Sequence, residues 1–258
     1  MEWRDEATVL SVRKHGEGSA VVECFVRDRG RWAGLVRGAG SPRLRAALQP
    51  GNLVEATWRA RLADQLGNFA IETLRSRAAD WMSASLPLHG LNWLVSLARL
   101  LPERDPHPAI HDAFAVVLEH LGDASAAPAL FARFELAMLA ELGFGLSLAQ
   151  CALTGATEGL AFVSPRTGRA ATAAAGAPFA GKLFALPGFL LGVGAPEADD
   201  VAAALRLTGH FLARDVYLAR GLPPPDGRRA YLAAAGLRLD ATPPPDDTRH
   251  PIRGRERA

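Results

Sequence analysis

Residues 19–38 read SAVVECFVRDRGRWAGLVRG, and this stretch decides the fold of the first part of the chain. Residues 19–26 and 31–37 are rich in β-branched and aromatic side chains, and the Arg-Asp-Arg-Gly sequence at 27–30 separates them. Such a pattern predicts two short strands joined by a turn.

Similar runs lie on both sides of this stretch. They are Thr8–Arg13, Leu53–Leu62 and Asn68–Leu74, each bounded by a glycine-bearing turn. Five short strands at a spacing of roughly ten residues indicate a small antiparallel sandwich or barrel, which we place in a domain of residues 1–79. The insertion Pro42–Leu48 is compatible with a helical turn or with a mobile loop.

The spacing of apolar residues changes after Asp80 from about two to about 3.6, which predicts a helical domain over residues 80–242. The expected helices are Leu91–Leu101, Pro108–Leu121, Pro128–Leu142, Ala198–Leu218 and a short Arg228–Ala235. Residues 144–195 are rich in Gly, Ala and Pro and are predicted to be an irregular excursion. From Pro243 the apolar content is too low to offset the entropy of ordering, so residues 243–258 are predicted to be disordered. The predicted fold class is α+β, with a β-barrel followed by a helical domain.

The composition is that of a globular protein: 49% of the 258 residues are hydrophobic and 22% are charged. The two cysteines are too few for a disulfide framework or a four-thiolate zinc site. The charged N-terminus does not resemble an export signal, and no apolar run approaches the roughly 20 residues of a membrane span. We therefore expect a cytoplasmic protein without a membrane partner.

Charge divides unevenly along the chain. Residues 1–79 hold 13 Lys/Arg against 9 Asp/Glu, a net charge of +4, whereas residues 80–242 hold 12 against 15, a net charge of −3. The basic part favours a polyanion as partner. Its densest segment contains Arg27, Arg29, Arg31, Arg37, Arg43 and Arg45, with Asp28 as the one acidic residue.

Aromatic residues accompany these arginines. Trp32 lies between them in sequence, and Phe25 and Phe69 are on neighbouring predicted strands. Small barrels hold single-stranded nucleic acid with aromatic platforms beside a basic groove. The alternative is that the rings form the core of the barrel and that the arginines only make its surface soluble.

Motifs for catalysis or metal binding are weak. His107 and His111 are four residues apart with Asp112 adjacent, but a third ligand and an acidic base are missing. Cys151 has no second thiol at C-x-x-C spacing, and a lone cysteine is typically a small buried hydrophobic residue. The sequence contains no G-x-S-x-G, P-loop or G-x-G-x-x-G motif, which argues against a serine hydrolase, a P-loop NTPase and a dinucleotide-binding protein. We expect no metal and no cofactor.

The order of several short motifs resembles that of the bacterial recombination mediator family RecO. In the basic part these motifs are Val9–Glu17, Val21–Val26, Gly30-Arg31, Arg37-Gly38-Ala39, Arg43-Leu-Arg45 and Leu48-Gln49-Pro50. In the helical part they are Arg133-Phe-Glu-Leu136, Leu142-Gly143, Cys151, Ser164-Pro165-x-x-Gly168 and Leu186-Pro187. The resemblance covers about residues 3–235.

The resemblance implies an N-terminal OB-fold barrel and a C-terminal helical domain. It also implies a non-enzymatic role in DNA repair and recombination: binding single- and double-stranded DNA, annealing complementary strands, and acting with RecR to load RecA onto DNA coated by single-strand-binding protein. Such a protein works in the cytoplasm, at the nucleoid during repair. Some relatives hold zinc with four cysteines; here Thr154 stands where the second thiol would be, so we predict no zinc.

Site residues follow from the same motifs. Arg31, Arg37, Arg43 and Arg45 are the expected phosphate contacts, with Trp32 beside them as a candidate DNA-binding residue. For the acidic C-terminal tail of single-strand-binding protein, the candidates on the helical domain are Arg99 and Arg133. The alternative is that either arginine is solvated or pairs with Glu135 or Glu103.

Two other functions remain open from the sequence. An OB-fold adaptor that binds RNA would have the same barrel and charge, because contacts to the ribose 2′-hydroxyl cannot be read from sequence. An enzyme with its site between the two domains is the third possibility, although no positioned nucleophile, base or metal cluster supports it.

Overall fold

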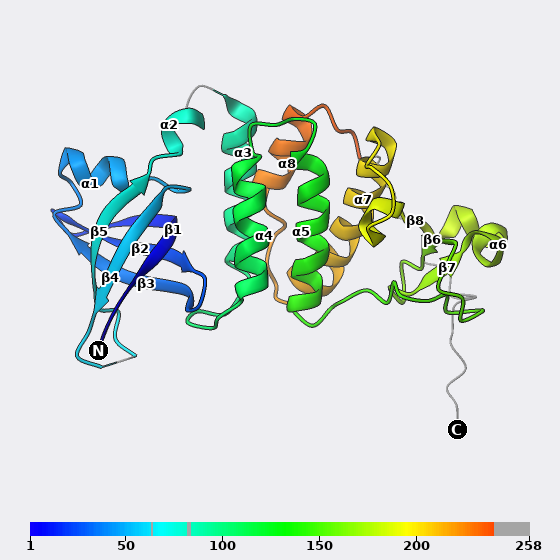
Figure 1. Cartoon of the computed structure of the whole chain (residues 1–258), viewed down its shortest axis with the longest axis horizontal. Helices are drawn as coiled ribbons and strands as arrows, with labels where there is room; N and C mark the ends of the chain where they lie inside the picture. The colour runs from blue at the N-terminus through cyan, green and yellow to red at the C-terminus, as the bar shows by residue number, and fades with distance from the viewer. Residues whose placement is uncertain (63, 82–83, 240–258) are drawn as a thin grey trace. The chain divides into compact units, whose positions relative to one another are not determined.

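Five strands form the first part of the molecule, in a computed structural model that describes residues 1–62, 64–81 and 84–239. They are β1 (Glu2–His15), β2 (Ser19–Val26), β3 (Gly30–Arg37), β4 (Leu53–Arg59) and β5 (Asn68–Arg75). The strands close into a barrel in the order β1-β2-β3-β5-β4 (Figure 1). Neighbouring strands are antiparallel except β3 and β5, which pair in parallel. This arrangement confirms the predicted OB-like barrel.

Alternate positions of each strand fill the barrel. On β2 the inward residues are Ala20, Val22, Cys24 and Val26, all at most 4% exposed. Helix α1 (Pro42–Ala47) adds Ala47 to the same core, followed by Leu48. The insertion between β3 and β4 is therefore a helix that packs on one end of the barrel, not a mobile loop.

Local hydrogen bonds fix α1. The Ser41 side chain accepts a hydrogen bond from the backbone N–H of Leu44, and Pro42 occupies the first helical turn, where its missing N–H costs nothing. At the other end, the buried Asn52 amide donates to the carbonyl oxygens of Ala46 (2.9 Å) and Ala47 (3.2 Å). The Asn52 Oδ1 accepts from the backbone N–H groups of Arg77 (2.9 Å) and Ala78 (3.0 Å), so one side chain joins α1 to the segment after β5.

Three helices follow the barrel: α2 (Ala78–Trp81), α3 (Ser85–Ala98) and α4 (Pro108–Glu119). The outer face of β2 and β3 packs against α4 and the loop that precedes it. The Phe25 ring lies 5.4 Å from Phe114 and 5.0 Å from His111, and Arg27 makes two hydrogen bonds of 2.8 Å to Asp112. Gly30 has a φ of +71°, and a Cβ there would clash with the Asp105 carbonyl, so glycine permits the close approach of this loop.

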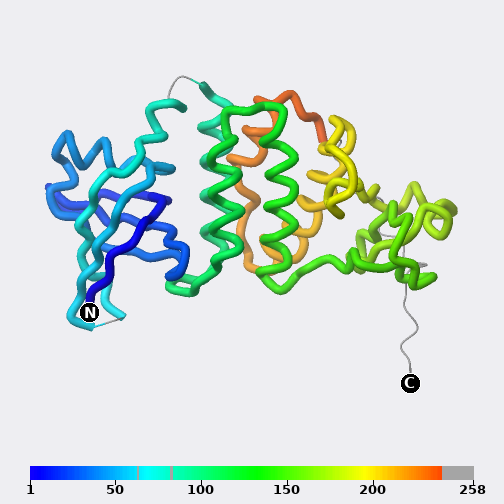
Figure 2. Tube along the Cα trace, viewed as in Figure 1, coloured from blue at the N-terminus to red at the C-terminus, as the bar shows by residue number. Residues whose placement is uncertain are grey.

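The barrel and α1–α4 make up one compact unit, residues 1–122; the second unit begins at Asp123. The tube in Figure 2 follows the chain of each unit. The sequence placed the domain boundary at 79/80, which stays a prediction. No helix among the described residues has both the length and the apolar character to span a membrane.

The second unit is built on α5 (Ala127–Glu141), α7 (Ala198–Phe211) and α8 (Asp226–Ala234). Glu135 of α5 is fully buried, pairs with Arg228 of α8 at 2.8 Å, and accepts a hydrogen bond of 2.6 Å from Thr208 of α7. This network connects all three helices. The last long helix was predicted to run to Leu218; the α-helix ends at Phe211 and continues as the π-helical segment η3 (Leu212–Tyr217).

Residues 144–195 contain more regular structure than their sequence predicts. A three-stranded sheet of order β7-β6-β8 is formed by β6 (Leu160–Val163), β7 (Ala170–Thr172) and β8 (Phe184–Ala185). Short helical segments accompany it: α6 (Ala173–Gly176), η1 (Ala177–Lys182) and η2 (Gly188–Leu191). Cys151, Ala171 and Leu183 form its small core. The tail predicted to be disordered, residues 243–258, lies outside the described residues.

Candidate nucleic-acid interface

Four exposed cations lie at one end of the barrel, and we name them the basic rim: Lys14, Arg37, Arg43 and Arg45. Lys14 is near the end of β1 and pairs with Ala20 of β2. Arg37 ends β3, opposite Ser19 at the start of β2, and Arg43 and Arg45 belong to α1. The strand register and α1 thus bring together charges that lie up to 31 positions apart in sequence.

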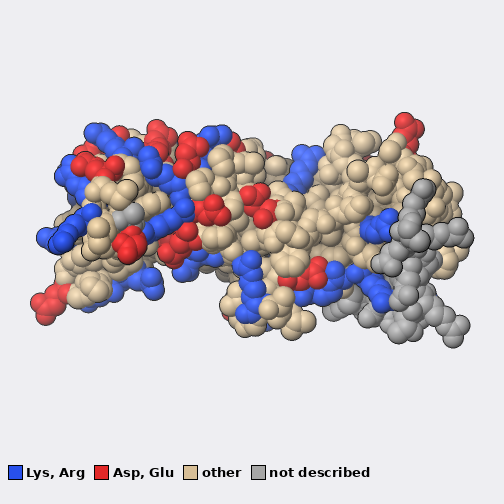
Figure 3. Space-filling view, turned by 90° about the horizontal axis from the view of Figure 1, so that it is seen from below, with Lys and Arg blue, Asp and Glu red and all other residues tan. Residues whose placement is uncertain are grey.

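The four cations of the basic rim have no acidic partners among the described residues, unlike several other arginines of the barrel surface. Among the described residues, no carboxylate lies within ion-pairing distance of its four cations. By contrast, Arg4 pairs with Glu55 and Arg59 pairs with Glu2 at 2.7 Å. In Figure 3 charged side chains of both signs gather over the first unit, at the left. Unpaired cations on a protein surface are available to phosphates.

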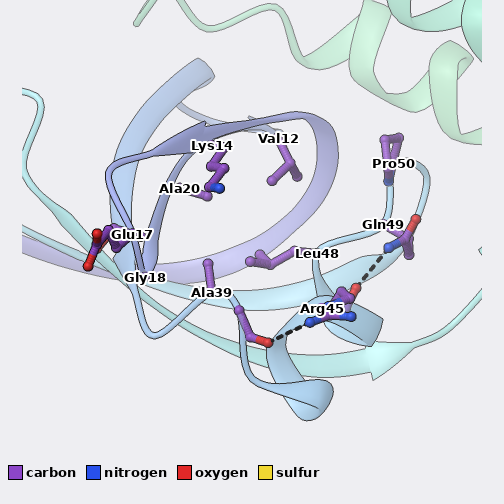
Figure 4. Close-up of a pocket in the computed structure, with 12 residues that line it drawn as sticks. Val12, Lys14, Glu17, Gly18, Ala20, Ala39, Arg45, Leu48, Gln49 and Pro50 are labelled. Atoms are coloured by element: carbon purple, nitrogen blue, oxygen red, sulfur yellow. Dashed lines mark hydrogen bonds between the residues drawn. The ribbon is translucent and has the colours of Figure 1, made fainter.

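A cavity of about 380 Å³ lies beside the basic rim, between the β1–β2 hairpin and α1 (Figure 4). Its walls are largely apolar and include Val12, Ala39 and Leu48, with Lys14 on one side and Arg45 on the other. The Arg45 Nη2 donates a hydrogen bond of 2.9 Å to the carbonyl of Gly40, which fixes the guanidinium at the cavity edge.

The structure separates Arg31 from the other predicted phosphate contacts. Arg31 is 8% exposed, forms an ion pair with the buried Glu23, and donates through Nε to the Leu101 carbonyl at 3.0 Å. Its guanidinium therefore faces protein groups on the covered side of the barrel. The expectation that Arg31 contacts DNA is corrected on this ground: it is a structural residue.

Trp32 also lies elsewhere than the sequence suggested. It points into the barrel, where its ring contacts Trp3 at 5.5 Å and Trp58 at 5.2 Å. Phe69 is 5% exposed in the same core, and Phe25 is fully covered by α4. These rings form the interior of the unit, as in the alternative interpretation, and do not provide an exposed stacking platform.

The two partner-binding candidates belong to different units. Arg99 follows α3 in the first unit and pairs with Glu23 Oε2 at 3.0 Å. Arg133 is exposed on α5 in the second unit; it donates a hydrogen bond of 3.0 Å to the Phe189 carbonyl and lies over the Phe189 ring. Arg133 beside an aromatic ring retains the chemistry expected of a carboxylate-binding residue, while Arg99 is held by a protein carboxylate.

Lys14 is the rim residue that the sequence analysis missed. Its neighbours in sequence, Arg13 and His15, gave no reason to prefer it. The hairpin contained the signal. Across the Gly16–Gly18 turn, Lys14 pairs with Ala20, which is an inward position. Lys14 therefore lies on the inward side of β1, at the open end of the barrel.

Two further titratable residues singled out in the sequence, His111 and Cys151, have shifted pKa values. Burial lowers the pKa of His111, whose ring packs on Phe25. Burial alone would raise the pKa of the Cys151 thiol, but hydrogen bonds from the Thr154 hydroxyl and from nearby backbone N–H groups lower it to about 6. Within residues 1–62, 64–81 and 84–239, no three His, Cys, Asp or Glu side chains are grouped to hold a metal ion.

Comparison with known proteins matches both parts of the chain to family models. Residues 1–77 match the N-terminal model of recombination protein O, and residues 90–222 match the C-terminal model of the same protein. The two matches together cover most of the chain and include the basic rim.

Individual relatives are similar over nearly their whole length. The DNA repair protein RecO of Beijerinckia indica subsp. indica is 50% identical over 236 residues, which cover 90% of this chain and 94% of the relative. That of Rhizobium etli strain CFN 42 is 49% identical, covering 91% and 93%. That of Methylobacterium nodulans is 50% identical, covering 90% and 97%.

Proposed function

Since the chain belongs to the RecO family of DNA repair and recombination proteins, we propose that it is a recombination mediator that binds and anneals single-stranded DNA through the basic rim. The observation that carries this proposal is the set of four exposed cations at one end of the barrel without carboxylate partners among the described residues. The family match itself agrees with the prediction of a non-enzymatic recombination protein.

The arrangement suits annealing. Cations on a rim neutralise backbone phosphates, and phosphate contacts position a strand without reading its sequence. The outer face of β2 and β3, where OB folds commonly hold oligonucleotides, is occupied by α4 through Phe25, Phe114 and Arg27. A strand bound at the rim leaves most of its bases free to pair with a complementary strand. The same rim accepts double-stranded DNA through its phosphates.

The remaining steps of mediation are proposed from the family. They are binding of RecR, binding of the acidic tail of single-strand-binding protein, and loading of RecA onto coated DNA at the nucleoid in the cytoplasm. For the acidic tail we retain Arg133, because its guanidinium is exposed beside the Phe189 ring and can pair with a carboxylate while the ring packs on an apolar side chain. Arg99 is less suited because Glu23 already pairs with it.

The test is the salt dependence of single-stranded DNA binding, measured by fluorescence anisotropy. Each phosphate contact contributes about −0.7 to the slope of log affinity against log salt for a single strand. Replacing Arg37, Arg43 and Arg45 together with alanine should weaken binding to every sequence and flatten the slope by about 2. A peptide with the acidic tail should bind to this variant and to the unchanged protein alike.

A matched control removes three other exposed arginines. Arg4, Arg59 and Arg75 each pair with a carboxylate, so the triple alanine variant of these residues loses the same net charge. It should keep most of the affinity and the full slope. Equal losses in the two variants would mean that only net charge matters, and unchanged binding in the rim variant would refute the rim assignment. Tighter binding of an RNA strand of the same sequence would favour the RNA adaptor instead.

A further inference from the structure

The cavity between the β1–β2 hairpin and α1 has two kinds of surface. Apolar side chains make up most of its wall: Val12, Ala20, Ala39, Leu48 and Pro50. Its volume of about 380 Å³ lies within the range of about 300–1,000 Å³ that is typical of small-ligand sites. The cavity lies in the same unit as the basic rim and shares two of its cations.

These two cations flank the apolar wall. Figure 4 shows Lys14 on the strand side and Arg45 on the helix side, with Ala39 and Leu48 between them. The hydrogen bond from Arg45 to the Gly40 carbonyl uses one of its five N–H groups and leaves others for a ligand anion. A ligand that fits must therefore join an apolar body to negative charge on both sides of it.

We propose that this cavity holds one unstacked nucleobase of a bound DNA single strand, with the flanking phosphates on Lys14 and Arg45. The inference rests on the proposed function and adds the part of the strand that enters the protein. A base presents flat apolar faces to Val12 and Leu48, and its backbone supplies an anion on each side. Sequence-independent binding of single strands commonly combines such base contacts with cations along the backbone.

The polar lining favours a base over an acidic peptide. Glu17, Ser19 and Gln49 also line the cavity. The Glu17 carboxylate can accept a hydrogen bond from the exocyclic amino group of a base, whereas the carboxylate side chains of an acidic peptide offer it no such donor. The Gln49 amide, which donates 2.8 Å to the Arg45 carbonyl, adds an acceptor oxygen for the same purpose.

The experiment compares two probes of equal length and charge. One is a labelled mixed-sequence DNA 15-mer, and the other carries tetrahydrofuran residues in place of its nucleosides, so that the phosphates remain and the bases are absent. The base-free strand should bind about tenfold more weakly, with the same salt slope. Equal affinities would overturn the base pocket and leave the rim proposal intact. Failure of both probes to bind at low salt would refute the rim and the pocket together.

A variant that fills the cavity tests whether the difference in affinity between the normal and the base-free strand arises at this site. Ala39→Leu should bring the affinity for the normal strand down to that for the base-free strand. Ala70→Leu makes the same change on the exposed outer face of β5 and should keep the tenfold difference. A difference that persists in Ala39→Leu would place the base contacts elsewhere and overturn the proposal.

A second variant does not depend on tolerance of a larger side chain. Val12 is 36% exposed, so Val12→Ser should fold, and it replaces an apolar wall by a polar one. The difference between the two probes should shrink at least about threefold. An unchanged difference in Val12→Ser, with unchanged thermal unfolding, would contradict a base held against this wall.

Discussion

Arg31 was expected to bind phosphate, but its side chain is buried in contacts within the protein. Its guanidinium joins Glu23 on β2 to the Leu101 carbonyl, and both ionic side chains are about 10% exposed, at 10% and 9%. Removing one partner of a buried ion pair leaves the other charge with poor solvation. Arg99, on the more exposed side, also contacts Glu23 and compensates in part.

Arg31→Ala should therefore lower the free energy of unfolding by about 3 kcal/mol, as measured by urea denaturation. The salt slope of DNA binding by the folded variant should stay unchanged, because Arg31 does not reach the rim. The exposed Arg43→Ala serves as the comparison: it should change the slope and leave stability within about 0.5 kcal/mol. A reversed pattern in the two variants would restore Arg31 as a DNA contact.

Cys151 predicts a pH dependence of stability. The thiol has a pKa of about 6 in the folded protein, below the value of about 8.5 in an unfolded chain. Its stabilising contribution is therefore complete above about pH 8.5, declines as the pH falls, and is absent below about pH 6. The free-energy difference between the protein and Cys151→Ala should grow from pH 6 to pH 8.5 in urea unfolding.

Cys24 provides the control of opposite sign. Burial raises the pKa of its thiol to about 12, so the stability that it contributes is present up to about pH 8.5 and declines above it. The effect of Cys24→Ala should be constant between pH 6 and 8.5. If the Cys151→Ala difference were also constant over this interval, the lowered pKa would be wrong.

At the scale of elements, α1 depends on Asn52 for its attachment. The fully buried amide makes four hydrogen bonds to main-chain groups of α1 and of the segment at Arg77 and Ala78. Leaving buried main-chain groups unpaired costs about 1–3 kcal/mol each.

Asn52→Ala should consequently lower the unfolding free energy by at least about 3 kcal/mol, and Asn52→Asp by no less, because its buried carboxylate would face the carbonyl oxygens of Ala46 and Ala47. The exposed Asn92→Ala on α3 is the matched control and should stay within about 0.5 kcal/mol. Urea denaturation of the three variants measures these free energies of unfolding. A loss below about 1 kcal/mol in Asn52→Ala would mean that water replaces the amide.

The elements differ in how well their sequences predict them. β2 and β3 are eight residues long, rich in β-branched and aromatic side chains and bounded by turns, and both were predicted nearly to their ends. The strands β6, β7 and β8 are two to four residues long, too short to show a period, so their sheet could not be predicted. Helix α1 is six residues long and was left undecided for the same reason.

The candidate site was predictable only in part, because the alternation of side chains along β3 gives the face of each residue but not what covers that face. Trp32 and Val36 share the inward face, while Arg31 and Arg37 share the outward face. Alternation alone could have placed Trp32 in the core. It could not separate Arg31 from Arg37, because that depends on the loop before α4, which covers the first half of β3 and comes more than sixty residues later in sequence.

For the whole molecule, the covering of β2 and β3 bears on where the first domain ends. A fragment of residues 1–79 would expose Phe25, Glu23 and Arg31, whereas a fragment of residues 1–122 retains α4 and the loop that cover them. The longer fragment should unfold at a higher urea concentration and with a larger m-value, because it buries more surface. Equal midpoints for the two fragments would support the boundary at 79/80.

Helix α1 also affects the rate at which a bound DNA strand is released. The same six residues place Ala47 in the barrel core and Arg43 and Arg45 on the surface, so these arginines have no hinge of their own. Release of a strand then requires no opening of a loop or lid. It depends on competition by solution ions, and dissociation should quicken smoothly with salt and show no slow step at saturating competitor. Such a contact, made and broken one phosphate at a time, would suit the mediator role proposed above.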